Sequence, residues 1–311
     1  MTTALISHPD CLNHVTPPGH PEQVARLQAV EEALESPRFA ALLRCEAPLC
    51  DDESLLLAHP KGYLDALAAA APKDGFAALD ADTHMSPGTL DAARRAVGAN
   101  LLAVDMVMNG EAANAFAAIR PPGHHAERAT PMGFCLFGNV AIAAKHALER
   151  HGLSRVAIVD FDVHHGNGTQ DLVWDDPRIL FVSTHQMPLY PGTGAADETG
   201  AHGNVLNIPL AAGCDGAAFR RKFTDLALPA LNAHAPEMLL ISAGFDAHRA
   251  DPLAGLNLVE DDFAWVTRQI CDIAARHAGG RVVSTLEGGY DLAALAASVA
   301  AHVGVLAEQG R

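Results

Sequence analysis

The sequence lacks the features that mark membrane, secreted and nucleic-acid-binding proteins. No uninterrupted apolar run is long enough to span a bilayer, and no basic segment precedes an apolar one near the N-terminus. The six cysteines are scattered without paired metal-binding spacing, so we expect free thiols. The 21 Lys and Arg against 37 Asp and Glu give a net charge of -16, which argues against binding to a phosphate backbone. We therefore expect a cytoplasmic protein with neither a membrane nor a nucleic acid as its partner.

The chain also lacks low-complexity linkers, repeats of fixed period and long blocks of one charge. Short apolar runs alternate instead with Ala-rich stretches of helical period, which predicts one α/β domain over residues 1–311, with helices on both faces of a mostly parallel sheet in three layers. The expected strands are 4–7, 115–119, 156–160, 179–183, 205–208, 238–242 and 282–286. The expected helices are 21–34, 61–71, 88–108, 139–151, 217–233, 261–277 and 292–307.

The most informative segment is 158–169, where an apolar run ends in acidic residues and histidine before it breaks into glycines. Residues i, i+2 and i+4 of an extended strand share one face, so the side chains of Asp160, Asp162 and His164 are predicted to point the same way. Open α/β sheets place their sites at the carboxyl ends of the strands. Two oxygen donors and one nitrogen donor there favour zinc or a similar divalent metal over an acidic surface loop.

Other predicted strands are also followed by residues that suit a functional site. These residues are His124 and His125 after 115–119, Thr184 and His185 after 179–183, Asp246 after 238–242, and Tyr290 after 282–286. If the strands are parallel, their carboxyl ends lie along one edge of the sheet, and one crevice collects these side chains. No single motif carries the interpretation, but their convergence does.

Together these groups predict metal-assisted hydrolysis of an amide. Asp162, His164 and Asp246 offer three ligands and leave a coordination position open, as catalytic zinc sites do. Zinc there would activate water and polarise a substrate carbonyl. A histidine with a pKa near neutrality would take a proton from the water and give it to the leaving amine. Tyr290, on a Gly-Gly turn, would donate its hydroxyl to the developing oxyanion.

The set resembles the zinc-dependent histone deacetylase superfamily, including its bacterial amidohydrolase and acetylpolyamine members. The segments that carry the resemblance span nearly the whole chain in family order: RPPGHH at 120–125, GFC at 133–135, DFDVHHGNGT at 160–169, SAGFD at 242–246 and EGGY at 287–290. The residue after His165-Gly166 is Asn167 and not aspartate, which is similar to the class II branch. The resemblance implies the arginase/deacetylase-like α/β/α fold.

The resemblance implies roles that agree with this chemistry. The implied ligands of one zinc ion (Zn2+) are Asp162, His164 and Asp246. His125 would be the general base and acid, and His124 an electrostatic partner paired with Asp160. Asn167 would orient His125; being neutral, it cannot raise the basicity of that histidine as a carboxylate would. Tyr290 would polarise the acyl carbonyl.

A substrate tunnel and a potassium (K+) site are implied in the same way. The implied tunnel residues are Gly133, Phe134, Tyr190, Leu253, Gly288 and Gly289. Phe134 matches one wall, but the opposite wall, usually phenylalanine, is Tyr190 here, which changes the polarity of the tunnel. The implied potassium ligands are backbone carbonyls and side chains around Asp160, Asp162, His164, Ser183 and Thr184.

The residues expected at the entrance of the substrate tunnel indicate the class of substrate. Polyamine-specific relatives of the class II type carry a glutamate after an Asp-Pro pair, and here Asp251-Pro252 is followed by Leu253. Bacterial polyamine enzymes also carry a long insertion for which this chain lacks room. Both features favour acetyl-lysine or another acylated amine, with an acetylpolyamine or small-molecule amidohydrolase or an esterase as the alternative. The acidic net charge is weakly in favour of a cationic substrate.

Three rival interpretations are weighed against this one. Arginase-like chemistry with two manganese ions needs an aspartate where this sequence has Gly166. A non-catalytic module that reads acylated ligands would not need Tyr290 and the histidine pair. An esterase, or a deacylase for bulkier groups, stays open because of Tyr190. A homo-oligomer is compatible with the sequence.

Overall fold

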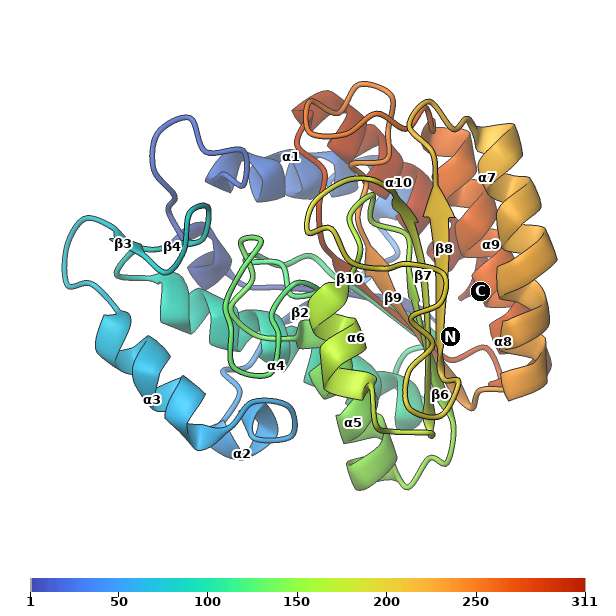
Figure 1. The fold of residues 1–311 in the computed structure, drawn as a ribbon, viewed down its shortest axis with the longest axis horizontal. Helices are drawn as coiled ribbons and strands as arrows, with labels where there is room; N and C mark the ends of the chain where they lie inside the picture. Colours follow the sequence, from blue (N-terminus) through green and yellow to red (C-terminus); the bar gives the residue numbers. More distant parts are fainter. Residues whose placement is uncertain (1, 311) are drawn as a thin grey trace.

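The centre of the molecule is a sheet of eight strands in the order β2-β1-β5-β10-β9-β6-β7-β8, in a computed structural model that describes residues 2–310 (Figure 1). Every strand pairing in this sheet is parallel. Its strands are β1 (Thr3–Ser7), β2 (Leu43–Glu46), β5 (Asn114–Ala117), β6 (Val156–Asp160), β7 (Ile179–Gln186), β8 (Val205–Leu210), β9 (Met238–Ala243) and β10 (Val282–Leu286). A short antiparallel pair, β3 (Ala77–Ala78) and β4 (His84–Met85), lies apart from it.

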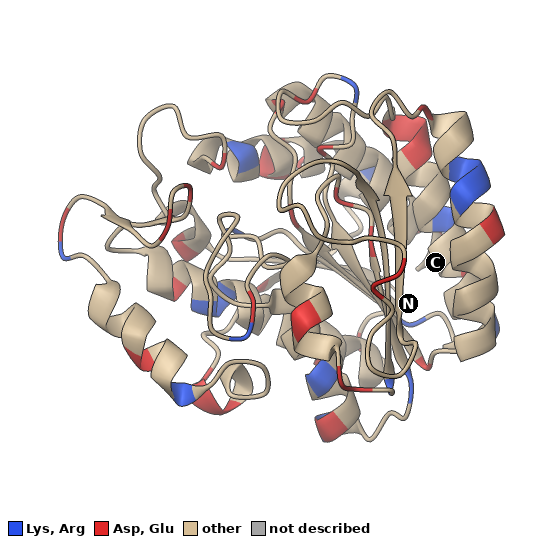
Figure 2. Ribbon diagram, in the orientation of Figure 1, with Lys and Arg blue, Asp and Glu red and all other residues tan. Residues whose placement is uncertain are grey.

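Helices cover both faces of the sheet, which confirms the predicted layering of a single α/β domain. The helices are α1 (Val24–Leu34), α2 (Asp52–Leu55), α3 (Lys61–Ala70), α4 (Thr89–Met108), α5 (Asn139–His151), α6 (Asn167–Val173), α7 (Gly216–Lys222), α8 (Leu228–His234), α9 (Glu260–His277) and α10 (Leu292–Gln309). In Figure 1, α4, α5 and α6 lie on one side of the sheet, and α7, α8 and α9 lie on the other. Figure 2 shows acidic and basic residues interspersed on the outer helices of both sides.

The central strands are buried along their whole length. Every residue of β6, β9 and β10 is buried. A parallel strand that is covered on both faces carries a continuous apolar run, and this is the pattern from which these strands were predicted. The polar residues that follow them therefore begin where the buried part of the sheet ends.

Some predicted bounds of strands and helices differ from those in the structure. Strand β7 continues to Gln186, so Thr184 and His185 lie within the strand and not after it. Strand β6 has the predicted bounds, but the extended backbone that we expected to continue to His164 ends at Asp160, and α6 begins at Asn167. The predicted helix 217–233 is divided into α7, a π-helical turn at Phe223–Ala227, and α8.

Helix α10 is long and apolar enough to cross a membrane by length and composition, which differs from what the sequence led us to expect. Half of its most apolar 18-residue window is buried in the molecule. Leu295, Val299, Val303 and Leu306 form its buried face, and α10 packs against α1 and α9. Packing within the domain therefore accounts for the apolar character of this helix.

Candidate active site

The candidate site lies at the carboxyl edge of the sheet, where the loops after β5, β6, β9 and β10 meet. Asp160 is the last residue of β6, and it pairs in register with Ser242 of β9 and Ser183 of β7. Asp162 and His164 lie in the loop after β6, not in the strand, so the alternation that we expected there is not the cause of their convergence. The loop itself turns both side chains toward Asp246, which follows β9.

Asp162, His164 and Asp246 bring three ligand atoms to one point. Nδ1 of His164 lies 3.1 Å from Oδ1 of Asp162 and 3.1 Å from Oδ2 of Asp246. All three side chains are buried, and their ligand atoms lie within 4.8 Å of one another. Two carboxylate oxygens and one imidazole nitrogen form a donor set that suits zinc. Because the set has only three ligands, it leaves a coordination position open for water or substrate.

Backbone N–H groups hold the two carboxylates in place. The amide of His164 donates to Oδ1 of Asp162 (2.9 Å), and the amide of Gly288 donates to Oδ2 of the same residue (2.8 Å). The amide of Val163 donates to Oδ1 of Asp246 (2.8 Å). Gly288 is required here because a Cβ atom would run into the carboxylates of Asp246 and Asp162. Such supporting bonds orient ligands before a metal binds.

The electrostatics of the three residues also fit a cation. Burial, reinforced by the neighbouring carboxylate of Asp162, raises the pKa of Asp246 to about 7. Burial opposes a charged imidazole, but the hydrogen bonds to the two carboxylates outweigh it and raise the pKa of His164 to about 10. The buried carboxylates of Asp162 and Asp246 have oxygens within 4.8 Å of each other, so they need a positive charge between them, which a divalent metal would supply.

The histidine pair is held by two different partners. Nδ1 of His124 lies 2.9 Å from Oδ2 of Asp160, and Nδ1 of His125 lies 2.7 Å from Oδ1 of Asn167. The amide nitrogen of Asn167 donates to Oε1 of Glu127 (2.8 Å), so its carbonyl oxygen must face His125. His125 therefore carries its proton on Nδ1, and its Nε2 is left as an acceptor.

Their surroundings separate the pKa values of the two histidines. Burial opposes the charged form of His124, but the carboxylates of Asp162 and Asp160 outweigh it and raise its pKa well above the ordinary value. Burial and the positive charge of His124 hold the pKa of His125 well below the ordinary value. His125 is therefore the neutral member of the pair, and the pair divides into a base and a fixed charge.

Glu287 has a role that the sequence reasoning did not assign. Its Oε2 accepts hydrogen bonds from the amides of Gly123 (2.7 Å) and His124 (3.2 Å), and its Oε1 accepts one from the hydroxyl of Ser242 (3.1 Å). The fully buried carboxyl thus joins the loop before the histidine pair to β9 and β10. The sequence feature that could have pointed to Glu287 is its position at the start of the Glu-Gly-Gly-Tyr motif.

Tyr290 sits between Arg26 and Phe134. The guanidinium carbon of Arg26 lies 4.8 Å from the centre of its ring, and the rings of Tyr290 and Phe134 are 5.9 Å apart at a steep angle. The amide of Tyr290 donates to Asp251, which also accepts from the amide of Leu253 (2.8 and 2.9 Å). Burial raises the pKa of Tyr290 well above its usual range, so the hydroxyl stays protonated and able to donate.

These groups surround a cavity of about 230 Å³. Its lining residues are Asp82, His125, Gly133, Phe134, His164, Leu189, Tyr190, Leu253 and Tyr290. The ring of Tyr190 meets that of His125 edge to face at 5.2 Å between centres. Gly133 adopts a positive φ of 55°, and a Cβ atom there would run into the ring of His125. Gly288 and Gly289, which we expected in the tunnel, are not among the residues that line the cavity; Gly288 lies against the carboxylates of Asp162 and Asp246 instead.

Of the residues expected around potassium, Asp160, Ser183 and Thr184 lie on the adjacent strands β6 and β7, whereas Asp162 and His164 lie in the loop after β6. The hydroxyl of Thr184 donates to the backbone oxygen of Asp160 at 3.5 Å, and Oγ of Ser183 lies 2.9 Å from Nδ1 of His185. His165, the residue after His164, makes hydrogen bonds with Thr193 (2.8 Å) and Gln170 (3.0 Å). It takes no part in the three-residue cluster.

Comparisons with known proteins place this geometry in a family. The model of the histone deacetylase domain matches residues 20–306. An uncharacterized protein of Synechocystis is 48% identical over 300 residues, which cover 95% of this chain and 96% of that protein. A histone deacetylase-like amidohydrolase of Pseudomonas aeruginosa is 39% identical over 284 residues, covering 89% of this chain and 74% of that protein. The crystal structure of the HDA15 HD domain matches with a TM-score of 0.94 at 33% identity, covering 99% of this chain and 89% of that one. The chain therefore belongs to the histone deacetylase family.

Proposed function

We propose that this protein is a zinc-dependent amide hydrolase that removes acyl groups, above all acetyl, from amines such as lysine side chains. One observation carries the proposal. Asp162, His164 and Asp246 converge in a buried cluster, and they do so beside a histidine whose Nε2 is free to accept a proton. Both His125 and His164 line the same cavity, so a substrate carbonyl that enters it reaches both groups.

Zinc held by Asp162, His164 and Asp246 would supply Lewis acidity, which activates water and polarises an amide carbonyl. Nε2 of His125 takes the proton from the attacking water, because Asn167 and Glu127 keep the other ring nitrogen protonated. The same nitrogen then gives that proton to the amine as the C–N bond breaks. The products are a carboxylic acid and a free amine, so all atoms of water and amide are accounted for.

Tyr290 and His124 complete the reaction by stabilising charge. The hydroxyl of Tyr290 stays protonated and donates to the oxygen that becomes negative during attack. His124, paired with Asp160, keeps a positive charge next to His125 (4.0 Å between ring centres). That charge keeps His125 neutral at the start of the cycle and therefore ready to act as a base.

The cavity favours a linear acylated amine as substrate. Phe134, Leu189, Tyr190 and Leu253 provide apolar walls for an aliphatic chain such as that of lysine. Asp82 is a lining residue that carries a carboxylate. This acid supports a second candidate function, hydrolysis of an acetylated polyamine, because it offers a partner for a distal ammonium group.

We also propose that potassium binds beside β6 and β7, near Asp160, Ser183 and Thr184. The support is the register, in which Asp160 lies next to Ser183, and the approach of the Thr184 hydroxyl to the Asp160 carbonyl. Carbonyl and hydroxyl oxygens are the ligands that hard cations prefer. Activity assayed in potassium and in tetramethylammonium salts of equal ionic strength tests this site, and equal activity in both argues against it.

The substrate is tested by measuring kcat/KM of zinc-loaded enzyme for an acetyl-lysine peptide and an acetylated polyamine side by side. We expect the peptide to be preferred. Asp82→Asn is the matched variant: a selective loss of polyamine turnover in it would identify the polyamine as the substrate that Asp82 recognises. If the zinc-loaded enzyme hydrolyses neither compound nor an acyl ester, the hydrolase proposal is wrong.

A further inference from the structure

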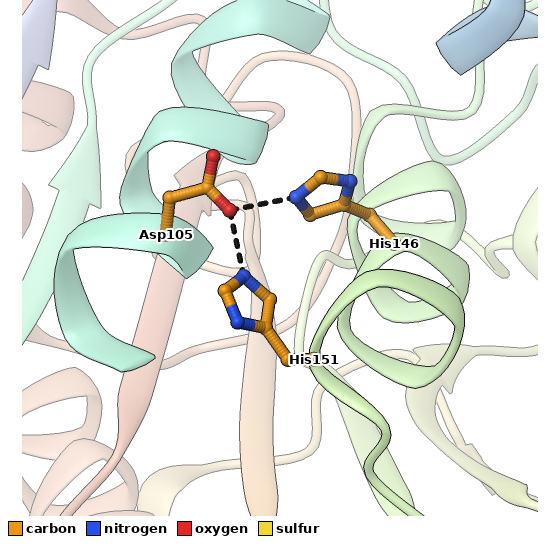
Figure 3. A group of neighbouring side chains, drawn as sticks. All are labelled: Asp105, His146 and His151. Atoms are coloured by element: carbon orange, nitrogen blue, oxygen red, sulfur yellow. Dashed lines mark hydrogen bonds and ion pairs between the residues drawn. The ribbon is translucent and has the colours of Figure 1, made fainter. Parts of the chain in front are cut away.

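A second group of metal-ligating side chains lies outside the candidate active site, where the C-terminal parts of α4 and α5 pack together. Oδ1 of Asp105 lies 2.7 Å from Nε2 of His146 and 2.7 Å from Nε2 of His151. Figure 3 shows the carboxylate on α4 and both imidazole rings, which come from α5, pointing at the same oxygen. These three ligand atoms lie within 4.8 Å of one another.

We propose that Asp105, His146 and His151 form a second site for a divalent transition metal of the zinc type, separate from the catalytic cluster. Two imidazole nitrogens and one carboxylate oxygen are a donor set for zinc, cobalt, nickel and copper, whereas calcium and magnesium prefer oxygen alone. Three protein ligands leave coordination positions to water. The inference uses none of the residues of the proposed hydrolase mechanism and stands independently of it.

The geometry needs only a small adjustment to accept the metal. Zinc bonds of about 2.0 to 2.1 Å in tetrahedral geometry set ligand atoms roughly 3.3 Å apart. The side chains of His146 and His151 are 15% and 16% exposed and that of Asp105 is 41% exposed. Each N–O separation must therefore grow by about 0.6 Å, from 2.7 Å, and because all three side chains are partly exposed they can move by this amount without disturbing the core.

The surroundings favour a cation at this point. Asp105 lies in the last turn of α4 and His151 is the last residue of α5, so the negative ends of two helix dipoles meet here. Asp105 and His146 also line a hollow of about 510 Å³. Asp51, Glu53 and Glu149 add carboxylates to the wall of this hollow, and Arg150 adds one positive charge. The hollow has room for the water molecules that would complete the coordination.

The alternative is a hydrogen-bonded cluster in which each neutral ring donates its Nε2–H to Asp105 and thereby joins α4 to α5. Metal binding replaces those two protons: both leave to solvent, and each Nε2 then gives its lone pair to the metal. The two descriptions differ in what the protein binds. A hydrogen-bonded cluster takes up no metal, whereas the proposed site adds one ion per chain.

The experiment is a zinc count by mass spectrometry after the folded protein is dialysed against a low concentration of free Zn2+. We expect two zinc ions per chain in the unmodified protein, one in His151→Ala and one in Asp246→Ala. The double variant His151→Ala/Asp246→Ala should bind none. His202→Ala, which removes an exposed histidine outside both clusters, is the control and should still bind two.

The counts separate this inference from the proposed hydrolase. If only the second site binds zinc, the unmodified protein and Asp246→Ala bind one ion and His151→Ala binds none. If His151→Ala binds as much zinc as the unmodified protein, the second site does not exist. If His151→Ala fails to fold, Asp105→Asn is used in its place, because it keeps the size of the side chain. As a second readout, zinc should raise the Tm of Asp246→Ala but not that of the double variant, and equal shifts would overturn the proposal.

Discussion

At the scale of single residues, the candidate site depends on groups that set the protonation of their neighbours. Asn167 presents an oxygen to His125 only because Glu127 accepts from its amide nitrogen. His124 is charged because two carboxylates lie next to it, and that charge lowers the pKa of His125. The reactive state of the His125 imidazole thus follows from five other side chains.

Tyr290→Phe tests the oxyanion donor. The change removes one hydroxyl from the wall of the cavity and leaves the ring packing against Phe134 and Arg26 in place. We expect kcat to fall about 100- to 1000-fold, the usual effect of removing one oxyanion donor, while the bound zinc is unchanged. Steady-state kinetics together with a zinc count check this. An unchanged kcat would mean that Tyr290 does not act on the reacting carbonyl.

Glu127→Ala tests the orientation of the histidine pair. Without the acceptor at Glu127 the amide of Asn167 is free to flip and to present its NH2 group to His125. Loss of one such hydrogen bond costs about 1 to 1.5 kcal/mol, so we expect kcat to fall roughly tenfold with little change in KM. Glu127→Gln keeps an acceptor oxygen and should stay close to the unmodified enzyme. Equal losses in both variants would show that charge, and not orientation, is what Glu127 contributes.

Which residues could be predicted at this scale depends on where they lie in the chain. Asp162, His164, Asp246 and Tyr290 follow buried strands, so the strand pattern was enough to predict that they lie at one edge of the sheet. Glu127 stands 40 residues from Asn167 and follows no strand, and no spacing relates the two. The same holds for Asp105 and the histidines of α5, whose proximity arises only from the packing of two helices.

At the scale of elements, the strands and long helices were predictable because burial imposes a pattern on them. Strand β2 was missed because Leu43–Glu46 lies at the edge of the sheet and is largely exposed, so it carries no apolar run. Helix α6 was missed because it begins inside the Gly166-Asn167-Gly168 turn, where glycines argue against a helix. Tertiary packing decides both of these elements.

Glu22 ties three elements together beneath the site. Its carboxylate pairs with Arg120, after β5, and with Arg26 of α1, whose guanidinium also donates to the carbonyls of Glu287 and Gly289 after β10. Burial opposes the charge of Glu22, but Arg120 outweighs it and holds the pKa of Glu22 well below its ordinary value. The stability that Glu22 adds is therefore full at neutral pH and is lost as the pH falls below the ordinary carboxyl pKa.

Glu22→Gln should destabilise the fold by about 3 to 5 kcal/mol, because two buried guanidinium groups lose their counter-charge. Urea unfolding at neutral pH measures the loss, and the same titration in acid should show a smaller difference between the two proteins. A difference that does not shrink in acid would contradict the assigned charge.

At the scale of the whole molecule, one parallel sheet brings the site together and the outer helices keep it covered. Helix α10 closes the face opposite α4 through a buried apolar stripe. Leu306 is fully buried in this stripe, so Leu306→Ala should lower the free energy of unfolding by about 2 to 5 kcal/mol. Gln309→Ala, at an exposed position of the same helix, should change it by less than about 0.5 kcal/mol. Similar values for the two variants would show that α10 is not packed as described.

The most direct test of the central claim is to measure bound zinc and kcat together in His125→Ala and Asp246→Ala, both made in a His151→Ala background so that only the active site contributes zinc. We predict that the His125 variant keeps one zinc ion per chain while its turnover falls at least about 100-fold, as expected for losing a general base. The Asp246 variant should lose both the zinc and the activity. Wild-type turnover in the His125 variant, or hydrolysis by a zinc-free Asp246 variant, would contradict the mechanism.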